Sequence, residues 1–300
     1  ERYLWTGRAF SDLYVVNTIT QEISDFDPVI NSPENEGTAV ISPDGMMLVF
    51  TRCYVDQDYD AWCKLMYSKL QGSVWSEAVP FPFVKDKINY GQPAFAANGT
   101  TLFFSSDDPS GQGGHDIFFT QADPGGLWSE PVNLGPMINT IGAEQYPTVY
   151  KDTLFFSSDH LAGLGGLDIF KTYLDVNNQW VPPINLRAPV NSGGDDFGYV
   201  VDTFASPKDN VLLQGFFTSS RAGVSRSDDI YAFTINGLKD GSDIAGNPKD
   251  ETPVEKPVDY QLFLSLKVME TKFEVKDDKN SRRIGKRTIP NGTIVITEGL

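Results

Sequence analysis

Four aspartates enclose two glycine-rich stretches of similar sequence, and they are the residues best suited to hold a metal ion. Asp107 and Asp116 bound the first stretch, and Asp159 and Asp168 bound the second. Carboxylates at both ends of such a loop could surround Ca²⁺ with the oxygen ligands that it prefers. The alternative is that these aspartates accept hydrogen bonds from loop amides while the glycines adopt positive φ angles. Because the pattern recurs, we expect the structural role and predict neither a metal nor a cofactor.

A second set of mostly acidic residues precedes short segments of small and apolar residues that recur through the chain. Its members stand three residues before a proline or its equivalent: Glu36, Tyr90, Glu144 and Asp195. If these segments line a channel, the carboxylates would ring one mouth of it and attract a cation or a basic peptide. The alternative is that they are solvated acids in the loops of an acidic protein.

The residues that nucleophilic or zinc chemistry requires are scarce. The two histidines, His115 and His160, fall in the glycine-rich stretches without a fixed partner. A nucleophile needs an adjacent base, so we interpret both histidines as solvated loop residues. The sequence contains no Gly-x-Ser-x-Gly elbow, Walker loop or zinc-spaced cysteine and histidine cluster. We therefore predict no catalytic residue.

The only two cysteines, Cys53 and Cys63, stand at the ends of one predicted hairpin arm. This position would bring them close together across two neighbouring strands. In an oxidising compartment such a pair could form a disulfide. The alternative is a pair of half-buried thiols, and the backbone geometry decides between the two.

The elements that must position these residues repeat with a period of 52 residues. Phe-Phe-Ser-Ser-Asp at 103–107 returns at 155–159, and Asp-Ile-Phe at 116–118 returns at 168–170. Equivalent stations lie at 12–14, 64–67 and 229–231. A period near 50 residues is typical of an array or a propeller.

Each repeat contains four short segments of strand length. They are rich in Val, Ile, Phe, Tyr and Thr and are bounded by Gly, Pro, Asn and Asp, which is typical of β-strands. No segment has the length and periodicity of a helix. Four-stranded units in tandem predict an all-β fold, a five-bladed β-propeller, with six blades as the alternative because closure of the ring requires further strands.

The composition changes beyond the repeats. We assign residues 1–236 to the propeller, residues 237–259 to a linker and residues 260–300 to the start of a small β-sandwich. The linker has hardly any large apolar residues. The last part carries eight basic and five acidic residues, a net charge of +3 in a chain of net charge −16. We expect opposite charge and an apolar strand to dock this part on the propeller.

The net charge of −16 excludes classes of partner. Nucleic acids and anionic membranes repel such a protein. No apolar run approaches the roughly 18 residues of a membrane helix, so no direct membrane insertion is expected. The chain begins inside a repeat without a signal peptide, and we expect it to be a mature fragment of a longer protein.

The repeats resemble those of a known family. Ser42-Pro43-Asp44-Gly45 and the recurring Phe-Phe-Ser-Ser-Asp and Asp-Ile-Phe segments are similar to WD40-like (TolB-type) propellers of bacterial envelope proteins. The variant at 128–136, Trp-Ser-Glu-Pro-Val-Asn-Leu-Gly-Pro, resembles propellers of OmpA-family lipoproteins, among them peptidoglycan-binding components of the type IX secretion system. Residues 264–296 resemble the start of a carboxypeptidase regulatory-like domain. Lys64 and Tyr90 depart from the pattern, because each replaces an acid.

The resemblance implies a non-enzymatic scaffold in the periplasm, associated with the outer membrane. Such a module would bind other envelope proteins of the secretion complex, and it would reach peptidoglycan only through a domain outside this sequence. The second hypothesis is a propeller-type glycan-active enzyme, which would need converging carboxylates or a His/Tyr pair in the channel. The third is a propeller that binds a small ligand or a metal.

Overall fold

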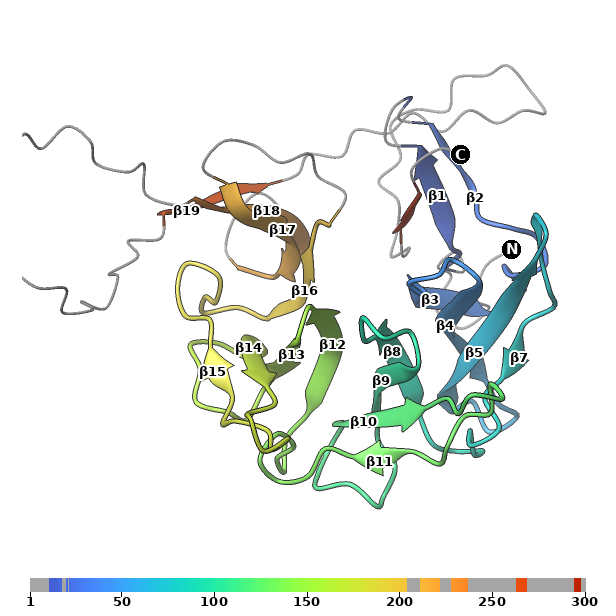
Figure 1. The fold of residues 1–300 in the computed structure, drawn as a ribbon, viewed down its shortest axis with the longest axis horizontal. Coiled ribbons are helices and arrows are strands. Elements are labelled where there is room, and N and C mark those ends of the chain that lie inside the picture. Colours follow the sequence, from blue (N-terminus) through green and yellow to red (C-terminus); the bar gives the residue numbers. More distant parts are fainter. Residues whose placement is uncertain are drawn as a thin grey trace, which may run out of the picture.

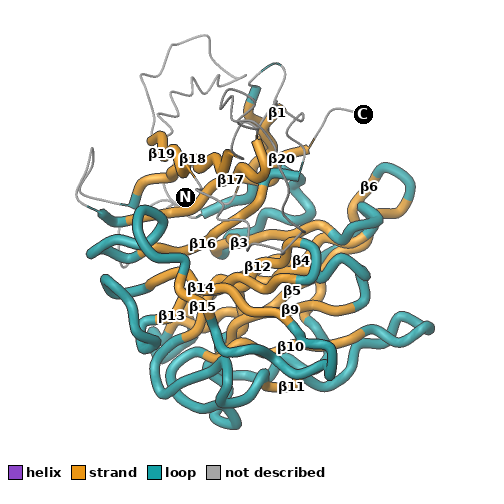
Figure 2. The backbone as a smooth tube through the Cα atoms, turned by 60° about the vertical axis from the view of Figure 1, so that its left-hand side comes forward, coloured by secondary structure: helices purple, strands orange, loops and turns teal. Residues whose placement is uncertain are grey.

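The computed structural model describes residues 11–17, 20, 22–203, 211–221 and 228–236, together with the backbone of two strands at 263–268 and 294–297. In this part of the chain every regular element is a β-strand, and strands and loops alternate throughout (Figure 2). A search of the same residues finds no helix with the length and apolar character to span a membrane. The predicted linker, 237–259, lies outside the described residues.

Most of these strands form four antiparallel sheets, which surround a common axis as the blades of a β-propeller (Figure 1). The first blade comprises β3 (Asn35–Ile41), β4 (Met47–Val55), β5 (Ala61–Gln71), β6 (Val74–Trp75) and β7 (Val79–Pro80). The second comprises β8 (Tyr90–Phe95), β9 (Thr101–Ser106), β10 (Asp116–Gln121) and β11 (Val132–Asn133). The third comprises β12 (Glu144–Tyr150), β13 (Thr153–Ser158), β14 (Asp168–Tyr173) and β15 (Ile184–Asn185). The fourth comprises β16 (Asp196–Val201), β17 (Val211–Ser219), β18 (Asp229–Asn236) and β19 (Phe263–Val268).

The prediction of five blades and a separate sandwich is met only in part. A three-stranded sheet of β1 (Tyr14–Asn17), β2 (Ile23–Asp25) and β20 (Ile294–Thr297) accompanies the four blades. Its strand β20 pairs in parallel with β1. The segment expected to open a sandwich contains β19, which instead pairs antiparallel with β18 as the outer strand of the fourth blade. The two strands that the structure describes after residue 260 therefore join sheets that begin in the repeats.

The continuous apolar triplets of the repeats follow from burial on both faces of a blade. On β9, Leu102 and Phe104 pack in one cluster with Val49 of the first blade. The residue between them, Phe103, packs in another cluster with Phe156 of the third blade. Alternate side chains thus serve opposite neighbours, as in other sheets covered on both faces.

The first strand of every blade is innermost, and each contains a β-bulge. β3, β8, β12 and β16 surround the axis, and successive members of this series are in contact (Figure 1). The ladder to the second strand shifts register at an equivalent place in all four blades. One residue at each bulge has a left-handed φ: Thr38 at 41°, Gln92 at 55°, Tyr146 at 54° and Gly198 at 64°. Bulges of this kind re-aim side chains and often stand next to binding sites.

A buried asparagine links successive blades. Asn139 precedes the third blade, yet its side chain binds both backbone groups of Ile117 in the second: its Oδ1 accepts the Ile117 N–H at 2.8 Å, and its Nδ2 donates to the Ile117 carbonyl at 2.9 Å. Asn191 holds Ile169 with the same two bonds. Both asparagines are almost fully buried. The asparagine therefore joins the third strand of one blade to the start of the next.

Glycines make a second link on the loops. The Gly114 N–H donates to the Gly142 carbonyl at 2.7 Å, so the β9–β10 loop lies directly on the segment that leads into the third blade. A Cβ at Gly113 would overlap the backbone of Ile141. Gly165 lies equally close to the backbone of Gly194. Close backbone approach explains why glycines recur at these positions.

Candidate functional site

The structure shows the burial and the partners of the four residues that were predicted to ring a channel mouth. Glu36 is 1% exposed and forms an ion pair with Arg52, with 2.6 Å between Oε1 and Nε. Its carboxylate also accepts hydrogen bonds from the N–H and hydroxyl of Ser32. Tyr90, at the equivalent place in the second blade, is 2% exposed and packs against Phe104. Neither side chain is available as a free charge.

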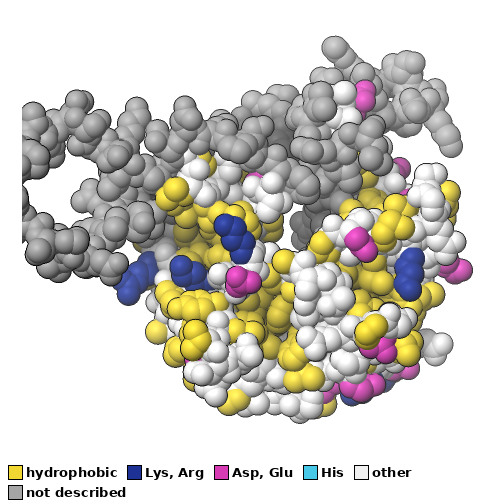
Figure 3. All heavy atoms as spheres, in the orientation of Figure 1, with side chains coloured by type: hydrophobic (Ala, Val, Ile, Leu, Met, Phe, Trp, Pro, Cys, Tyr) yellow, Lys and Arg dark blue, Asp and Glu magenta, His cyan; other side chains and the backbone are white. Residues whose placement is uncertain are grey.

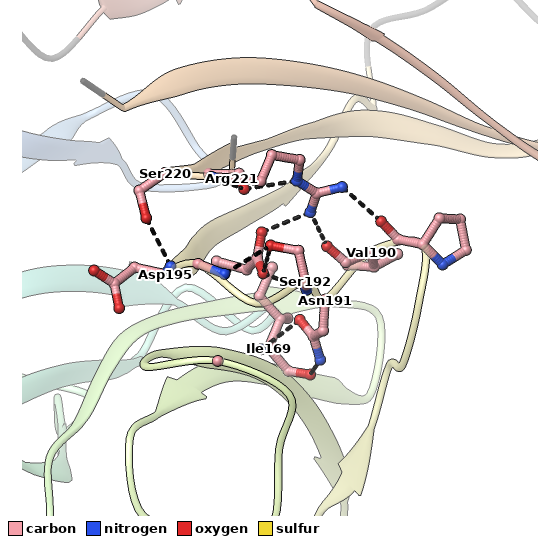
Figure 4. A network of polar contacts seen from close by, with 12 residues as sticks. Ile169, Val190, Asn191, Ser192, Asp195, Ser220 and Arg221 are labelled. Carbon is pink, nitrogen blue, oxygen red and sulfur yellow. Dashed lines mark hydrogen bonds and ion pairs between the residues drawn. The ribbon is translucent and has the colours of Figure 1, made fainter. Parts of the chain in front are cut away.

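In the fourth blade the structure moves the acidic position by one residue. Asp196, not Asp195, pairs with Ser219 of β17, as Glu144 pairs with Ser158 of β13 and Glu36 pairs with Arg52 of β4. Asp196 is fully buried, and its Oδ1 lies 2.6 Å from the Arg221 guanidinium (Figure 4). Asp195 is exposed, and its Oδ1 accepts the Leu167 N–H. Asp196 stands two residues before Gly198, the left-handed residue of its bulge, as Glu144 stands two residues before Tyr146, so Asp196 and not Asp195 is the equivalent of Glu144.

Arg221 closes the junction between the third and fourth blades. Besides the Asp196 carboxylate it donates to the carbonyls of Pro189 and Val190 and to the Ser219 hydroxyl (Figure 4). Its guanidinium also lies 4.8 Å from the centre of the Tyr231 ring. The charge of Asp196 is therefore matched by a cation that makes four hydrogen bonds of its own.

Glu144 is buried without such a cation. Its carboxylate accepts the Thr140 N–H at 2.6 Å, the Thr140 hydroxyl at 2.8 Å and the Ser158 hydroxyl at 2.6 Å. Burial raises its pKa above the ordinary value of 4.5, although these hydrogen bonds oppose the shift. Glu144 thus fastens the loop before β12.

The raised pKa of Glu144 makes the free energy of unfolding depend on pH. A carboxyl whose pKa is raised by folding stabilises the fold in its protonated form, and that contribution is lost as the pH rises through the folded pKa. We expect Glu144→Gln to be more stable than the unmodified protein at pH 7, since the Thr140 and Ser158 hydroxyls can also accept from an amide. The difference in unfolding midpoint should shrink as the pH falls toward 4.5. Exposed Glu130→Gln is the control, and equal pH dependence of the two variants would contradict the assignment.

The four loop aspartates hold backbone and do not converge on one point. Asp107 accepts the Asn89 N–H, and Asp159 accepts the Ala143 N–H, so both cap the start of their own blade. Asp116 and Asp168 are 1% exposed, and their Oδ2 atoms accept loop N–H groups, those of Gln112 and of Leu164 and Gly165. The described residues contain no group of three His, Cys, Asp or Glu side chains placed to hold a metal. These hydrogen bonds are those expected of the structural role, whereas the Oδ1 atoms of Asp116 and Asp168 are buried without a hydrogen-bond partner.

Cys53 and Cys63 occupy directly opposite positions on β4 and β5 and form a disulfide. The Cys63 N–H donates to Asn89 Oδ1 at 2.8 Å, and Asn89 in turn donates to Asp107. The bridged hairpin of the first blade is thereby attached to the second blade. This junction forms one wall of a cavity.

The cavity, of about 460 Å³, lies between the first two blades beside the innermost strands. Its lining is mostly uncharged and capable of hydrogen bonding: Asn35, Thr38, Thr51, Gln92, Ser105 and His115. His115 is half-buried here, whereas His160 is exposed, so only the second histidine matches the predicted solvated state. On the face shown in Figure 3, hydrophobic side chains cover more of the described surface than charged ones do.

Hydrogen bonds preset the groups that line the cavity. The Thr38 and Thr51 hydroxyls lie 2.7 Å apart, and Thr51 Oγ1 accepts the Gln92 N–H at 3.0 Å. Gln92 Oε1 accepts the Tyr146 N–H at 3.1 Å, which joins the second blade to the third. The amide oxygen of Gln92 is therefore fixed by a hydrogen bond within the protein. Hydroxyl and amide groups fixed in this way can read the donors and acceptors of a neutral polar ligand.

No protein-family model and no curated protein matches the sequence. Among solved structures, the chain is similar to a thermostable family-43 glycoside hydrolase, with 11% identity and a TM-score of 0.42 over 73% of this chain and 77% of that one. It is also similar to the catalytic domain of the GH62 α-L-arabinofuranosidase of Coprinopsis cinerea, with 8% identity and a TM-score of 0.40 over 75% and 71%. A Mycobacterium tuberculosis puromycin-hydrolyzing peptidase matches with 10% identity and a TM-score of 0.40 over 68% and 35%. At these identities the likeness concerns the fold alone.

These findings correct the functional prediction made from the sequence. The three matched structures are hydrolases, not components of a secretion complex. No family model links the repeats to OmpA-family lipoproteins such as PorE. The prediction of a non-enzymatic secretion scaffold, and with it the statement that the chain is not an enzyme, is therefore withdrawn.

Proposed function

We propose that the protein binds a carbohydrate in the cavity between its first two blades. The observation that carries the proposal is the lining: threonine hydroxyls and the Gln92 amide are fixed by hydrogen bonds on bulged innermost strands. A sugar offers hydroxyl groups that both donate and accept, as these side chains do. The cavity volume of about 460 Å³ lies within the range of ligand pockets.

The charges around the cavity favour a neutral ligand. Glu36 contributes to the lining, but its carboxylate is neutralised by Arg52 and buried. A charged ligand would lose its hydration without gaining an opposite charge, which costs far more than the transfer of a hydroxyl that keeps its hydrogen bonds. A neutral saccharide avoids this loss.

Cleavage of a bound glycan is the second function to test. Glycosidases place two carboxyl groups on either side of the scissile bond. Glu144 has the raised pKa of a general acid, since burial disfavours its charged form. Its three hydrogen bonds to Thr140 and Ser158 tie it to a loop. Binding is therefore the function that the geometry supports best, and cleavage is measured alongside it.

The test is a titration of the protein with neutral gluco-, xylo-, arabino- and manno-oligosaccharides by isothermal calorimetry, with reducing ends assayed in the same samples. At least one series should bind. Gln92→Glu keeps an oxygen for the Tyr146 N–H but removes the amide donor, and we expect it to weaken binding about tenfold. Gln179→Glu, on an exposed turn, is the matched control. Failure of every series to bind, or equal affinities of the two variants, would refute the proposal.

We also propose that the three-stranded sheet is the fifth blade of the ring. Asn31 Oδ1 accepts the Leu13 N–H at 2.9 Å, and Asn31 Nδ2 donates to the Leu13 carbonyl at 2.9 Å. Asn139 and Asn191 make these bonds at the blade junctions. We likewise propose that the repeats are of the WD40-like type. An envelope location is supported by the disulfide, because such bonds persist in oxidising compartments.

A further inference from the structure

We infer that the ligand is an oligosaccharide whose second sugar unit stacks on Tyr146 and Phe197, a pair called here the aromatic platform. This inference rests on the proposed function and extends it from one cavity to two adjoining subsites. The two rings stand on the innermost strands β12 and β16, which are neighbours around the axis (Figure 1).

The aromatic platform is a preformed surface. The ring centroids of Tyr146 and Phe197 are 4.6 Å apart, with an angle of 34° between the ring planes, so the two rings pack against each other and leave only their outer surfaces for a ligand. Both residues are half-buried, so each keeps part of its surface exposed. The face of an aromatic ring carries partial negative charge, and it can pack against the partially positive C–H groups of a sugar ring.

The backbone at Tyr146 supports a functional role for its ring. A φ of 54° is sparsely populated for a bulky residue, whereas glycine adopts it freely, and Gly198 occupies the equivalent bulge of the fourth blade. Thr38 and Gln92, which line the cavity, have the same conformation. Three of the four described bulges therefore hold a side chain where glycine would be unstrained. Strain of this kind is concentrated at binding sites.

Gln92 connects the aromatic platform to the cavity. Its side chain belongs to the cavity lining, and its Oε1 accepts the Tyr146 N–H at 3.1 Å. A ligand in contact with the Gln92 amide therefore lies next to the residue that carries the first ring of the platform. Around the axis the bulge residues change from a hydroxyl to an amide and then to an aromatic ring. Hydrogen bonds would fix one sugar unit, and stacking would hold the next.

The test compares affinities along one series, from the monosaccharide to the trisaccharide, using the tightest series found in the calorimetric panel. The unmodified protein should bind the trisaccharide about tenfold more tightly than the monosaccharide, a gain typical of one aromatic contact. Tyr146→Asn removes the ring, and asparagine tolerates the left-handed backbone. This variant should lose the length dependence, so that its affinities for the trisaccharide and the monosaccharide lie within about twofold of each other. Tyr59→Asn is the control, because Tyr59 is also left-handed, with φ 67°, and is 77% exposed.

The possible results separate the two proposals. If no sugar binds the unmodified protein, carbohydrate binding itself is refuted. If sugars bind without length dependence, or if Tyr146→Asn keeps it, only the aromatic platform is refuted. Phe197→Leu should give the same loss of length dependence with an unchanged backbone.

Discussion

Asn139→Ala is expected to lower the free energy of unfolding by about 3–4 kcal/mol, since it leaves buried backbone groups without partners. The side chain of Asn139 bonds both polar groups of Ile117, and its Nδ2 also lies 2.9 Å from Asn133 Oδ1. Asn139 is 2% exposed, so water cannot replace these bonds. Urea denaturation followed by tryptophan fluorescence measures the change.

Asn177→Ala is the matched control for this prediction. Asn177 is exposed on the turn after β14, and its side chain makes one long contact with Asp175. Its replacement should change stability by no more than about 0.5 kcal/mol. If both alanine variants unfolded at the same urea concentration, the link between blades through Asn139 would carry no energy and the account of the junctions would be wrong.

Gly113→Ala is expected to destabilise the protein by about 2–3 kcal/mol, because the new Cβ has no space. It would overlap the backbone of Ile141, in the segment before the third blade. Backbone cannot rotate away as a side chain can, so the β9–β10 loop must separate from that segment. The Gly114 hydrogen bond to the Gly142 carbonyl would then lengthen or break. Differential scanning calorimetry should show a lower unfolding temperature.

Gly193→Ala tests whether this effect depends on the site. Nothing lies within 4 Å of a Cβ at Gly193, and its φ is not left-handed. Alanine there should leave stability unchanged or raise it slightly, because it restricts the unfolded chain. A similar loss in both variants would show that glycine flexibility, and not close backbone approach, determines the stability of these loops.

Periodicity was enough to predict the blades. The 52-residue spacing of Asp116 and Asp168 places both at the start of a third strand, β10 and β14, paired with Ser106 and Ser158. The sequence also indicates strands that are covered on both faces, because their apolar residues stand in continuous triplets. The number of blades could not be predicted from the sequence, because the three-stranded sheet includes β20 from the far end of the chain.

The site was harder to predict, because it depends on pairing between distant strands. A bulge is defined by the partner strand, and nothing in the local sequence marks Gln92 as left-handed or as part of a cavity. The recurrence of Asn139 and Asn191 after an apolar residue was a usable signal for the junctions. Acidic residues were predicted to form a binding ring because carboxylates attract cations and basic peptides. The burial of Glu36, Glu144 and Asp196 and the ion pairs of Glu36 and Asp196 depend on contacts that sequence spacing cannot show.

A crystal structure of the protein soaked with the tightest-binding oligosaccharide tests the central claim most directly. The account predicts a sugar in the cavity between the first two blades, within hydrogen-bond distance of the Gln92 amide and the Thr51 hydroxyl. The next unit should lie against the rings of Tyr146 and Phe197. Sugar density at any other surface, with this cavity holding only water, would contradict the account.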